Sequence, residues 1–211
     1  MDPIQPSGHL LPNRWARTTM EAVEELLGTN GFQNLLKLAH LDQYSEELPE
    51  ASLEKGFDFA DISALFLGLE EMYGVRGGQS IVLRAGRAAF RNTLSDFGAL
   101  AGTKESAFQI LPLNIKLKLG LKALARISDH ISDQRTSLKE AGDHFEYIVH
   151  RNPVTWGRQN EERPICFFHV GLLEETLHQA SGGHEFRVDE TECQATGALA
   201  CKFLIQKEAL A

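Results

Sequence analysis

The spacing of hydrophobic residues changes once along this chain, near residue 131, and that change restricts the possible folds more than any other feature. Before it, hydrophobic residues recur every three or four positions, as on one face of a helix. The clearest such stripe consists of Leu113, Leu117, Leu121, Leu124, Ile127 and Ile131. After it, short segments alternate between polar and hydrophobic residues, as half-buried strands do. This pattern predicts an α+β fold, with helices covering one face of a small antiparallel sheet.

Residues 13–131 form the predicted helical part. Glycines at positions 28 and 74 are expected to end two of its helices, and the segment 76–78, Arg-Gly-Gly, is expected to make a turn. The acidic segment 41–56 is expected to be a loop or a broken helix. A further helix, over 80–98, carries small residues that predict close packing against a neighbouring element: Ala85, Gly86, Ala88 and Ala89. Alternation over 115–121 also fits a strand, but the spacing continues to Ile131 and favours a helix.

The two ends of the chain differ in pattern. Residues 1–12 contain three prolines and little periodicity, which predicts a flexible arm. Residues 132–211 predict the order β-β-α-β-β. The expected strands and helix are 136–140, 144–149, 165–179, 185–192 and 199–205. We expect this part to form one compact domain with 13–131.

Charge and composition exclude several classes of protein. The formal net charge is −8 and the basic residues are scattered, so no nucleic-acid-binding surface is expected. No hydrophobic run is long enough to span a membrane, and the N-terminus lacks the pattern of a secretory signal. Three cysteines, an odd number, argue against a disulfide framework. A cytoplasmic location is the expectation.

All three cysteines fall in the last quarter of the chain, which points to a metal site. Cys166 opens a predicted helix, while Cys193 and Cys201 stand four residues to either side of Gly197 and could face each other across a hairpin. Thiolates favour zinc. The fourth ligand could be Glu190, in the pattern E-x-x-C-x7-C, or one of two histidines, His169 and His184. Three thiolates and a carboxylate would form a closed, structural site. The alternative is three buried, unconnected cysteines.

Two segments carry a resemblance to a known family. The stretches P-I-C-F-F-H-V-G-L-L and F-R-V-D-E-T-E-C-Q-A-T-G-A-L-A-C-K-F resemble the 4-vinyl reductase domain family, over roughly residues 134–206. That family is named for a bacteriochlorophyll-pathway protein, and it includes the aromatic-sensing domains of phenol- and xylene-responsive activators and stand-alone hydrocarbon-binding proteins. The resemblance implies structural Zn²⁺ at Cys166, Glu190, Cys193 and Cys201. It also implies a homodimer with a fold like that of transport-protein-particle subunits, enclosing an apolar cavity.

The resemblance further implies a pocket for a small hydrophobic or aromatic molecule. Relatives hold phenol with a histidine and a tryptophan above an apolar pocket. The candidate ligand-binding residues in this chain are Phe108, His144, Phe145, Tyr147, Trp156, Phe168 and Leu172. Each could instead be an ordinary core residue. An aromatic molecule, the edge of a tetrapyrrole or an acyl chain would suit such a pocket.

Three functions follow from these expectations. The first is a zinc-stapled sensor or carrier of a small hydrophobic ligand that has no output domain of its own, since the chain contains no G-x-x-x-x-G-K-[ST] loop and leaves no room for a helix-turn-helix after residue 206. The second is an accessory factor in (bacterio)chlorophyll tetrapyrrole synthesis; a reductase is disfavoured because no G-x-G-x-x-G motif and no spare cysteines are present. The third is a structural interaction subunit. We prefer the first, a binding protein rather than an enzyme.

Overall fold

The computed structural model describes residues 1–94, 108 and 110–210, and its fold is α+β, as predicted. In chain order the elements are β1 (Leu10–Pro12), α1 (Asn13–Leu38), η1 (Asp42–Tyr44), β2 (Lys55–Asp58), α2 (Phe59–Leu94), α4 (Leu113–Ile131), β3 (Arg135–Ala141), β4 (His144–Arg151), η3 (Pro153–Thr155), α5 (Phe167–Ser181), β5 (Phe186–Glu192), η4 (Gln194–Thr196) and β6 (Cys201–Ala209). The order β-β-α-β-β after residue 131 agrees with the sequence prediction.

Four strands form the main sheet, in the order β3-β4-β6-β5, and every neighbouring pair is antiparallel. Alternate residues of the two central strands are buried, which is what a sheet with one covered face requires. On β4 these are Phe145, Tyr147 and Val149, and on β6 they are Cys201, Phe203 and Ile205. The sheet therefore presents one hydrophobic face to the helices.

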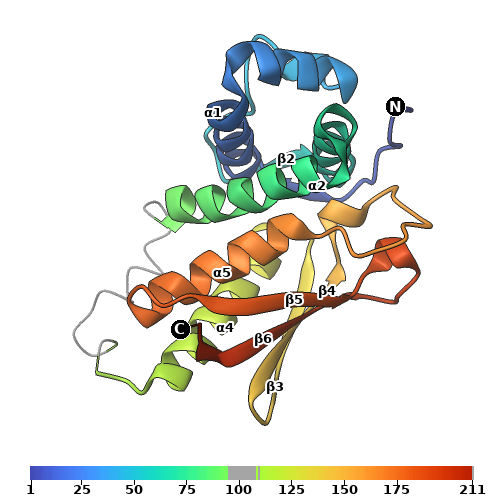
Figure 1. The fold of residues 1–211 in the computed structure, drawn as a ribbon. Helices are drawn as coiled ribbons and strands as arrows, with labels where there is room; N and C mark the ends of the chain where they lie inside the picture. The colour runs from blue at the N-terminus through green and yellow to red at the C-terminus, as the bar shows by residue number, and fades with distance from the viewer. Residues whose placement is uncertain (95–107, 109, 211) are drawn as a thin grey trace.

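The helices form layers over that face. Figure 1 shows α5 running along the sheet, the second half of α2 lying beside α5, and α1 with the first half of α2 forming the far end of the molecule. α4 packs against α5 and β3. None of the helices in the described part of the chain combines the length and the apolar character needed to cross a bilayer.

Glycines interrupt the two longest helices where the sequence predicts helix ends. Gly28 and Gly74 have φ of 71° and 72°, outside the helical region, so α1 and α2 each contain a kink. The expected turn at 76–78 is wrong, because helical structure resumes directly after Gly74. A Cβ on Gly78 would stand 2.6 Å from the Cα of Glu70. Gly78 therefore allows close packing across the kink at Gly74.

The small residues of α2 bring this helix against α5, as the sequence predicts. A Cβ on Gly86 would lie 2.3 Å from the carbonyl oxygen of Phe168, and a Cβ on Gly171 would lie 2.0 Å from that of Leu83. Each helix thus places a glycine against the backbone of the other. This contact fixes the position of the first turns of α5 relative to α2.

The N-terminal residues differ from the expected arm. Residues 10–12 form β1 and pair with β2, which begins at the end of the segment expected to be a loop. The backbone N–H groups of Ser7 and Gly8 donate to the carboxylate of Asp58 at 2.9 and 3.0 Å. That of Leu10 donates to Asp133 at 2.8 Å. Strands of three and four residues are too short to give a periodic pattern, so the sequence does not predict them.

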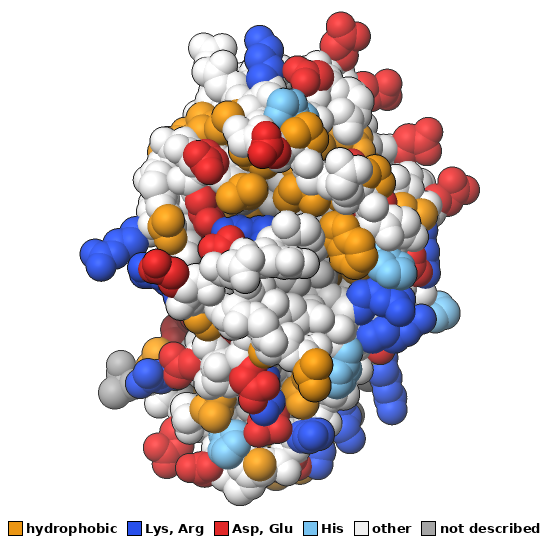
Figure 2. Space-filling model, turned by 90° about the vertical axis from the view of Figure 1, so that its right-hand side faces the viewer, with side chains coloured by type: hydrophobic (Ala, Val, Ile, Leu, Met, Phe, Trp, Pro, Cys, Tyr) orange, Lys and Arg blue, Asp and Glu red, His pale blue; other side chains and the backbone are white. Residues whose placement is uncertain are grey.

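The face shown in Figure 2 gives little indication of a binding site. On the face shown in Figure 2, acidic and basic side chains both occur, and hydrophobic side chains lie among them in small groups. The side chains that could bind a metal ion lie inside the protein instead, at the N-terminus of α5.

Candidate functional site

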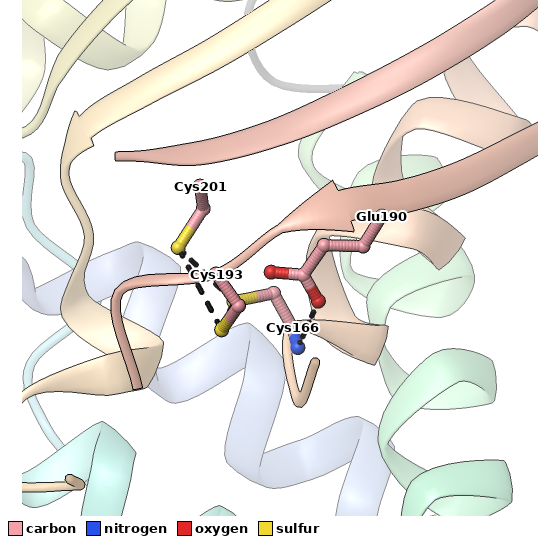
Figure 3. A group of neighbouring side chains, drawn as sticks. All are labelled: Cys166, Glu190, Cys193 and Cys201. Atoms are coloured by element: carbon pink, nitrogen blue, oxygen red, sulfur yellow. Dashed lines mark hydrogen bonds between the residues drawn. The ribbon is translucent and has the colours of Figure 1, made fainter. Parts of the chain in front are cut away.

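Four side chains that could hold a metal ion meet where the start of α5 approaches β5 and β6 (Figure 3). Glu190 lies on β5 two residues after the buried Val188, so strand alternation turns both toward the core. Cys201 is the first residue of β6, Cys166 is the N-cap of α5, and Cys193 begins the connection from β5 to β6. All three cysteines are completely buried.

The three sulfurs form a nearly equilateral triangle. The Sγ of Cys166 lies 3.6 Å from that of Cys201 and 3.8 Å from that of Cys193, and the third distance is 4.0 Å. A disulfide needs about 2.05 Å, and all three thiols are free. In a tetrahedral zinc site with Zn–S bonds of about 2.3 Å, neighbouring sulfurs stand about 3.8 Å apart. The triangle therefore has the dimensions of one face of a zinc tetrahedron.

The carboxylate of Glu190 is positioned to complete the tetrahedron. Its Oε2 accepts a hydrogen bond from the backbone N–H of Cys166 at 2.8 Å, at the N-terminus of α5, where negative charge is favourable. Its Oε1 is buried and has no hydrogen-bond partner. The four possible ligand atoms lie within 4.8 Å of one another. A cation bound between this carboxylate oxygen and the three thiols would supply the missing partner.

Without a cation, the burial of four acidic side chains close together shifts their pKa values. Burial, and then the charge of Cys193, raise the pKa of Glu190 to about 8. Burial raises the pKa of the Cys166 thiol, whereas hydrogen bonds from the other two thiols lower that of Cys193. A divalent cation would favour the charged form of every member. The residues present thus fit a closed site for a soft divalent metal.

The structure separates the alternatives for the fourth ligand. Neither His169 nor His184 belongs to the cluster. His169 is buried and contacts Gln134, while His184 is exposed. Cys193 and Cys201 do face each other at the end of the β5–β6 hairpin, since Glu192 pairs with Lys202 and the two sulfurs lie 4.0 Å apart, although Cys193 itself lies just beyond β5. Cys201 pairs with Val149 on β4, and Cys193 approaches it from the connection that contains η4.

A cavity lies one turn further along α5. Its volume is about 50 Å³, and side chains from six elements and the segment after α4 surround it. The wall is mostly hydrophobic, with a few polar groups near the C-terminal end of α4. The lining residues are Leu11, Pro12, Trp15, Phe90, Leu124, Ile127, Ser128, Ile131, Ser132, Gln134, Tyr147, Phe168, His169 and Leu172.

A buried polar pair forms part of the cavity wall. The side-chain nitrogen of Gln134 lies 3.2 Å from Nε2 of His169. Burial lowers the pKa of His169 to about 4, so the imidazole is neutral at pH 7. Its Nδ1 is buried without a hydrogen-bond partner. The ring stacks on Phe203 of the sheet, with centroids 5.7 Å apart.

The structure brings together three of the seven candidate ligand-binding residues. Tyr147, Phe168 and Leu172 line the cavity. The other four lie elsewhere. Phe145 is buried beneath Lys207, and His144 contacts Asp143 at the start of β4. Trp156 borders an open groove formed with residues 1–5, and Phe108 does not line the cavity.

Sequence reasoning missed several residues of the cavity wall. Trp15 and Gln134 gave no signal, because one belongs to an ordinary amphipathic helix and the other precedes a strand. His169 did give a signal, the spacing C-x-x-H, but this suggested a metal ligand. The spacing instead places His169 on the next turn of α5, between the cluster and the cavity.

A comparison with protein families decides the assignment of this region. Residues 145–207 match the family model of the 4-vinyl reductase domain. The match covers less than half of the chain, and it supports the assignment of this segment to the 4-vinyl reductase domain family. The matched domain contains α5, β5, β6 up to Lys207 and nearly all of β4, and it includes all four members of the cluster. The resemblance noted in the sequence is thereby confirmed. No curated protein matches the chain.

Solved structures with a similar fold include several H-NOX proteins. One, from a study of heme distortion in the H-NOX family, has a TM-score of 0.57 and 16% identity, covering 95% of this chain and 97% of that chain. An H-NOX mutant from S. oneidensis in the Fe(II) ligation state has a TM-score of 0.59 and 10% identity, covering 92% and 95%. Unliganded Fe(II) H-NOX from K. algicida has a TM-score of 0.56 and 15% identity, covering 95% and 97%. At these identities the likeness shows the fold alone. The expected likeness to transport-protein-particle subunits stays a prediction.

Proposed function

We propose that this protein binds a small, uncharged, mostly apolar molecule in the cavity beside α5, and that a zinc ion held by Cys166, Glu190, Cys193 and Cys201 fixes one wall of that cavity. The observation that carries the proposal is the hydrophobic cavity bordered by the buried Gln134–His169 pair. The Nδ1 of His169 is buried without a hydrogen-bond partner, which costs about 1–3 kcal/mol of stability. A ligand with one polar group could supply that partner.

The size of the cavity limits the ligand. A cavity of about 150 Å³ binds benzene. The present volume of about 50 Å³ admits only a few non-hydrogen atoms unless the walls move. Trp15 comes from a different element than Phe168 and Leu172, so small shifts of these side chains would enlarge the space. We infer that the ligand is a single-ring molecule or smaller.

Zinc would act here as a structural ion. Three thiolates and one carboxylate fill a tetrahedral shell and leave no position for substrate, so the site would stabilise the fold. Cys166 precedes Phe168 and His169 by two and three residues. Binding of the ion would therefore set the position of the cavity wall. The proposal includes a homodimer in the cytoplasm and assigns no enzymatic activity.

Tryptophan fluorescence tests the cavity directly. The background is Trp156→Phe, which leaves Trp15 as the reporter. Phenol and toluene are matched probes of similar size, in which a methyl group of toluene takes the place of the hydroxyl group of phenol. We expect phenol to change Trp15 emission saturably and to bind about fivefold more tightly than toluene, as one hydrogen bond contributes about 1 kcal/mol. His169→Phe should abolish the difference between the probes.

A cavity-filling variant provides the control. Leu124→Phe in the same background should weaken both probes while zinc content stays unchanged, because Leu124 lines the cavity and lies outside the cluster. Saturable binding of neither probe to the parent protein would contradict the proposal, as would binding that Leu124→Phe leaves intact.

A tetrapyrrole ligand is the second candidate, since one similar structure comes from work on heme in the H-NOX family. A tetrapyrrole is far larger than the cavity of about 50 Å³. It would require several helices to separate. Titration with hemin, followed by its absorbance, distinguishes the candidates. A one-to-one spectral shift that His169→Phe removes would favour the tetrapyrrole over the small ligand.

A further inference from the structure

The amide of Asn152 makes a direct contact with the sulfur of Cys166. Asn152 follows β4 directly and is only 3% exposed. Its side-chain Nδ2 lies 3.2 Å from the Sγ of Cys166. Its Oδ1 accepts a hydrogen bond from the backbone N–H of Val154 at 2.9 Å. Because an N–H group can only donate, the amide oxygen must face Val154, and the NH₂ group must face the sulfur.

The other two sulfurs accept hydrogen bonds from the backbone. The N–H of Gln194 donates to the Sγ of Cys201 at 3.3 Å. Backbone N–H groups of Ile165 and Ala195 contact Cys193 and contribute to lowering its pKa. Asn152 thus does for Cys166 what the backbone does for its two partners. Each sulfur of the triangle has at least one N–H donor.

Such donors matter because of the charge of the loaded site. Three thiolates and a carboxylate around one divalent cation leave a net negative charge inside the protein, where solvation by water is absent. Hydrogen bonds from N–H groups to sulfur reduce this cost and orient the ligands. The donor to Cys166 belongs to a side chain, so a substitution can remove this hydrogen bond without changing the backbone.

We propose that Asn152 is a positioning residue of the metal centre, whose amide N–H···S bond stabilises the Cys166 thiolate and raises the affinity of the site for zinc. This inference rests on the proposed zinc site. It assigns to Asn152 a role that the match to the family does not provide.

Two substitutions separate the contact with sulfur from the contact with the backbone. Asn152→Asp keeps an oxygen that can accept from Val154 but loses the donor and adds negative charge next to the thiolate. Asn152→Ala loses both contacts. Gln194→Ala is the matched control, because the Gln194 side chain contacts the carbonyl oxygens of His150 and Leu199, and only its backbone N–H reaches a sulfur.

The experiment measures zinc affinity by competition with a chelator, on the full chain, together with the sulfur-to-metal charge-transfer band of the Co²⁺ form. We expect Asn152→Ala and Asn152→Asp each to weaken zinc binding about 10–100-fold. We also expect both to shift the Co²⁺ band to lower energy, since the sulfur becomes more electron-rich. Gln194→Ala should keep the wild-type affinity and band position.

Each other outcome overturns the inference in a distinct way. If Asn152→Asp binds zinc as the wild type does while Asn152→Ala does not, Asn152 is a cap of η3 and nothing more. If both variants retain wild-type affinity and band position, the contact with Cys166 has no influence on the metal. If the wild-type chain binds neither Zn²⁺ nor Co²⁺, the proposed zinc site itself fails, and the inference fails with it. Should Asn152→Ala not fold, Asn152→Asp alone decides.

Discussion

Glu190 and His169 stand within a few residues of cysteines of the cluster, yet they do different things. Glu190 follows strand alternation and directs its carboxylate to the sulfurs, while His169 occupies the next turn of α5 and faces Gln134. Spacing alone left both as candidate ligands, because it does not give the direction of a side chain. The resemblance to a family, which carried E-x-x-C-x7-C as a unit, was needed to favour Glu190.

The buried histidine gives a prediction about pH. His169 has a pKa of about 4 in the folded protein and an ordinary value of 6.5 in the unfolded chain. The unfolded state therefore binds a proton at a higher pH than the folded state. The contribution of His169 to the free energy of unfolding is fully present above pH 6.5. It is lost as the pH falls toward 4, by about 3 kcal/mol in total.

The variant His169→Gln removes this titration while keeping a polar partner for Gln134. Its free energy of unfolding, measured with urea between about pH 4 and 7, should fall less steeply with acid than that of the wild type. His184→Gln changes an exposed histidine and should keep the wild-type slope. Equal slopes for His169→Gln and the wild type would contradict the burial of a neutral imidazole.

At the scale of elements, periodicity and glycine positions allowed much of the fold to be predicted. The strands and helix after residue 131 and the kinks at Gly28 and Gly74 follow from local sequence. Whether a helix resumes after a glycine depends on packing with other elements, which explains the error at 76–78. The short strands β1 and β2 exist because they pair with each other and not because of their own pattern.

The contact between α2 and α5 gives a prediction at this scale. Gly171→Ala would place a Cβ 2.0 Å from the carbonyl oxygen of Leu83, and the backbone of α2 can yield only by moving the helix. We expect a loss of about 3 kcal/mol in the free energy of unfolding and, because α5 carries Phe168 and Leu172, a weaker response of Trp15 to phenol. Gly77→Ala, whose nearest contact is the Tyr73 Cβ at 3.1 Å, should change stability by less than about 1 kcal/mol. Similar stability for both variants would show that the helices are not in close contact.

In the whole molecule, helix α5 connects the candidate metal site to the cavity. The cluster sits at the N-terminus of α5, and the next turn of that helix forms the cavity wall. The remaining cavity wall comes from β1, α1, α2, α4, β4 and the segment after α4. The sequence alone locates the cysteines and predicts a sheet with one hydrophobic face. It could not assemble the cavity, because the lining residues are spread from Leu11 to Leu172 and only the tertiary fold brings them together.

Native mass spectrometry of the purified chain tests the central claim most directly, because it weighs the folded protein together with any bound ion. The account predicts one zinc ion per chain, retained in the wild type and lost in both Cys166→Ser and Glu190→Gln, with His184→Gln, outside the cluster, keeping the ion. A folded wild-type chain that carries no zinc after purification, and takes up none when Zn²⁺ is added, would contradict it.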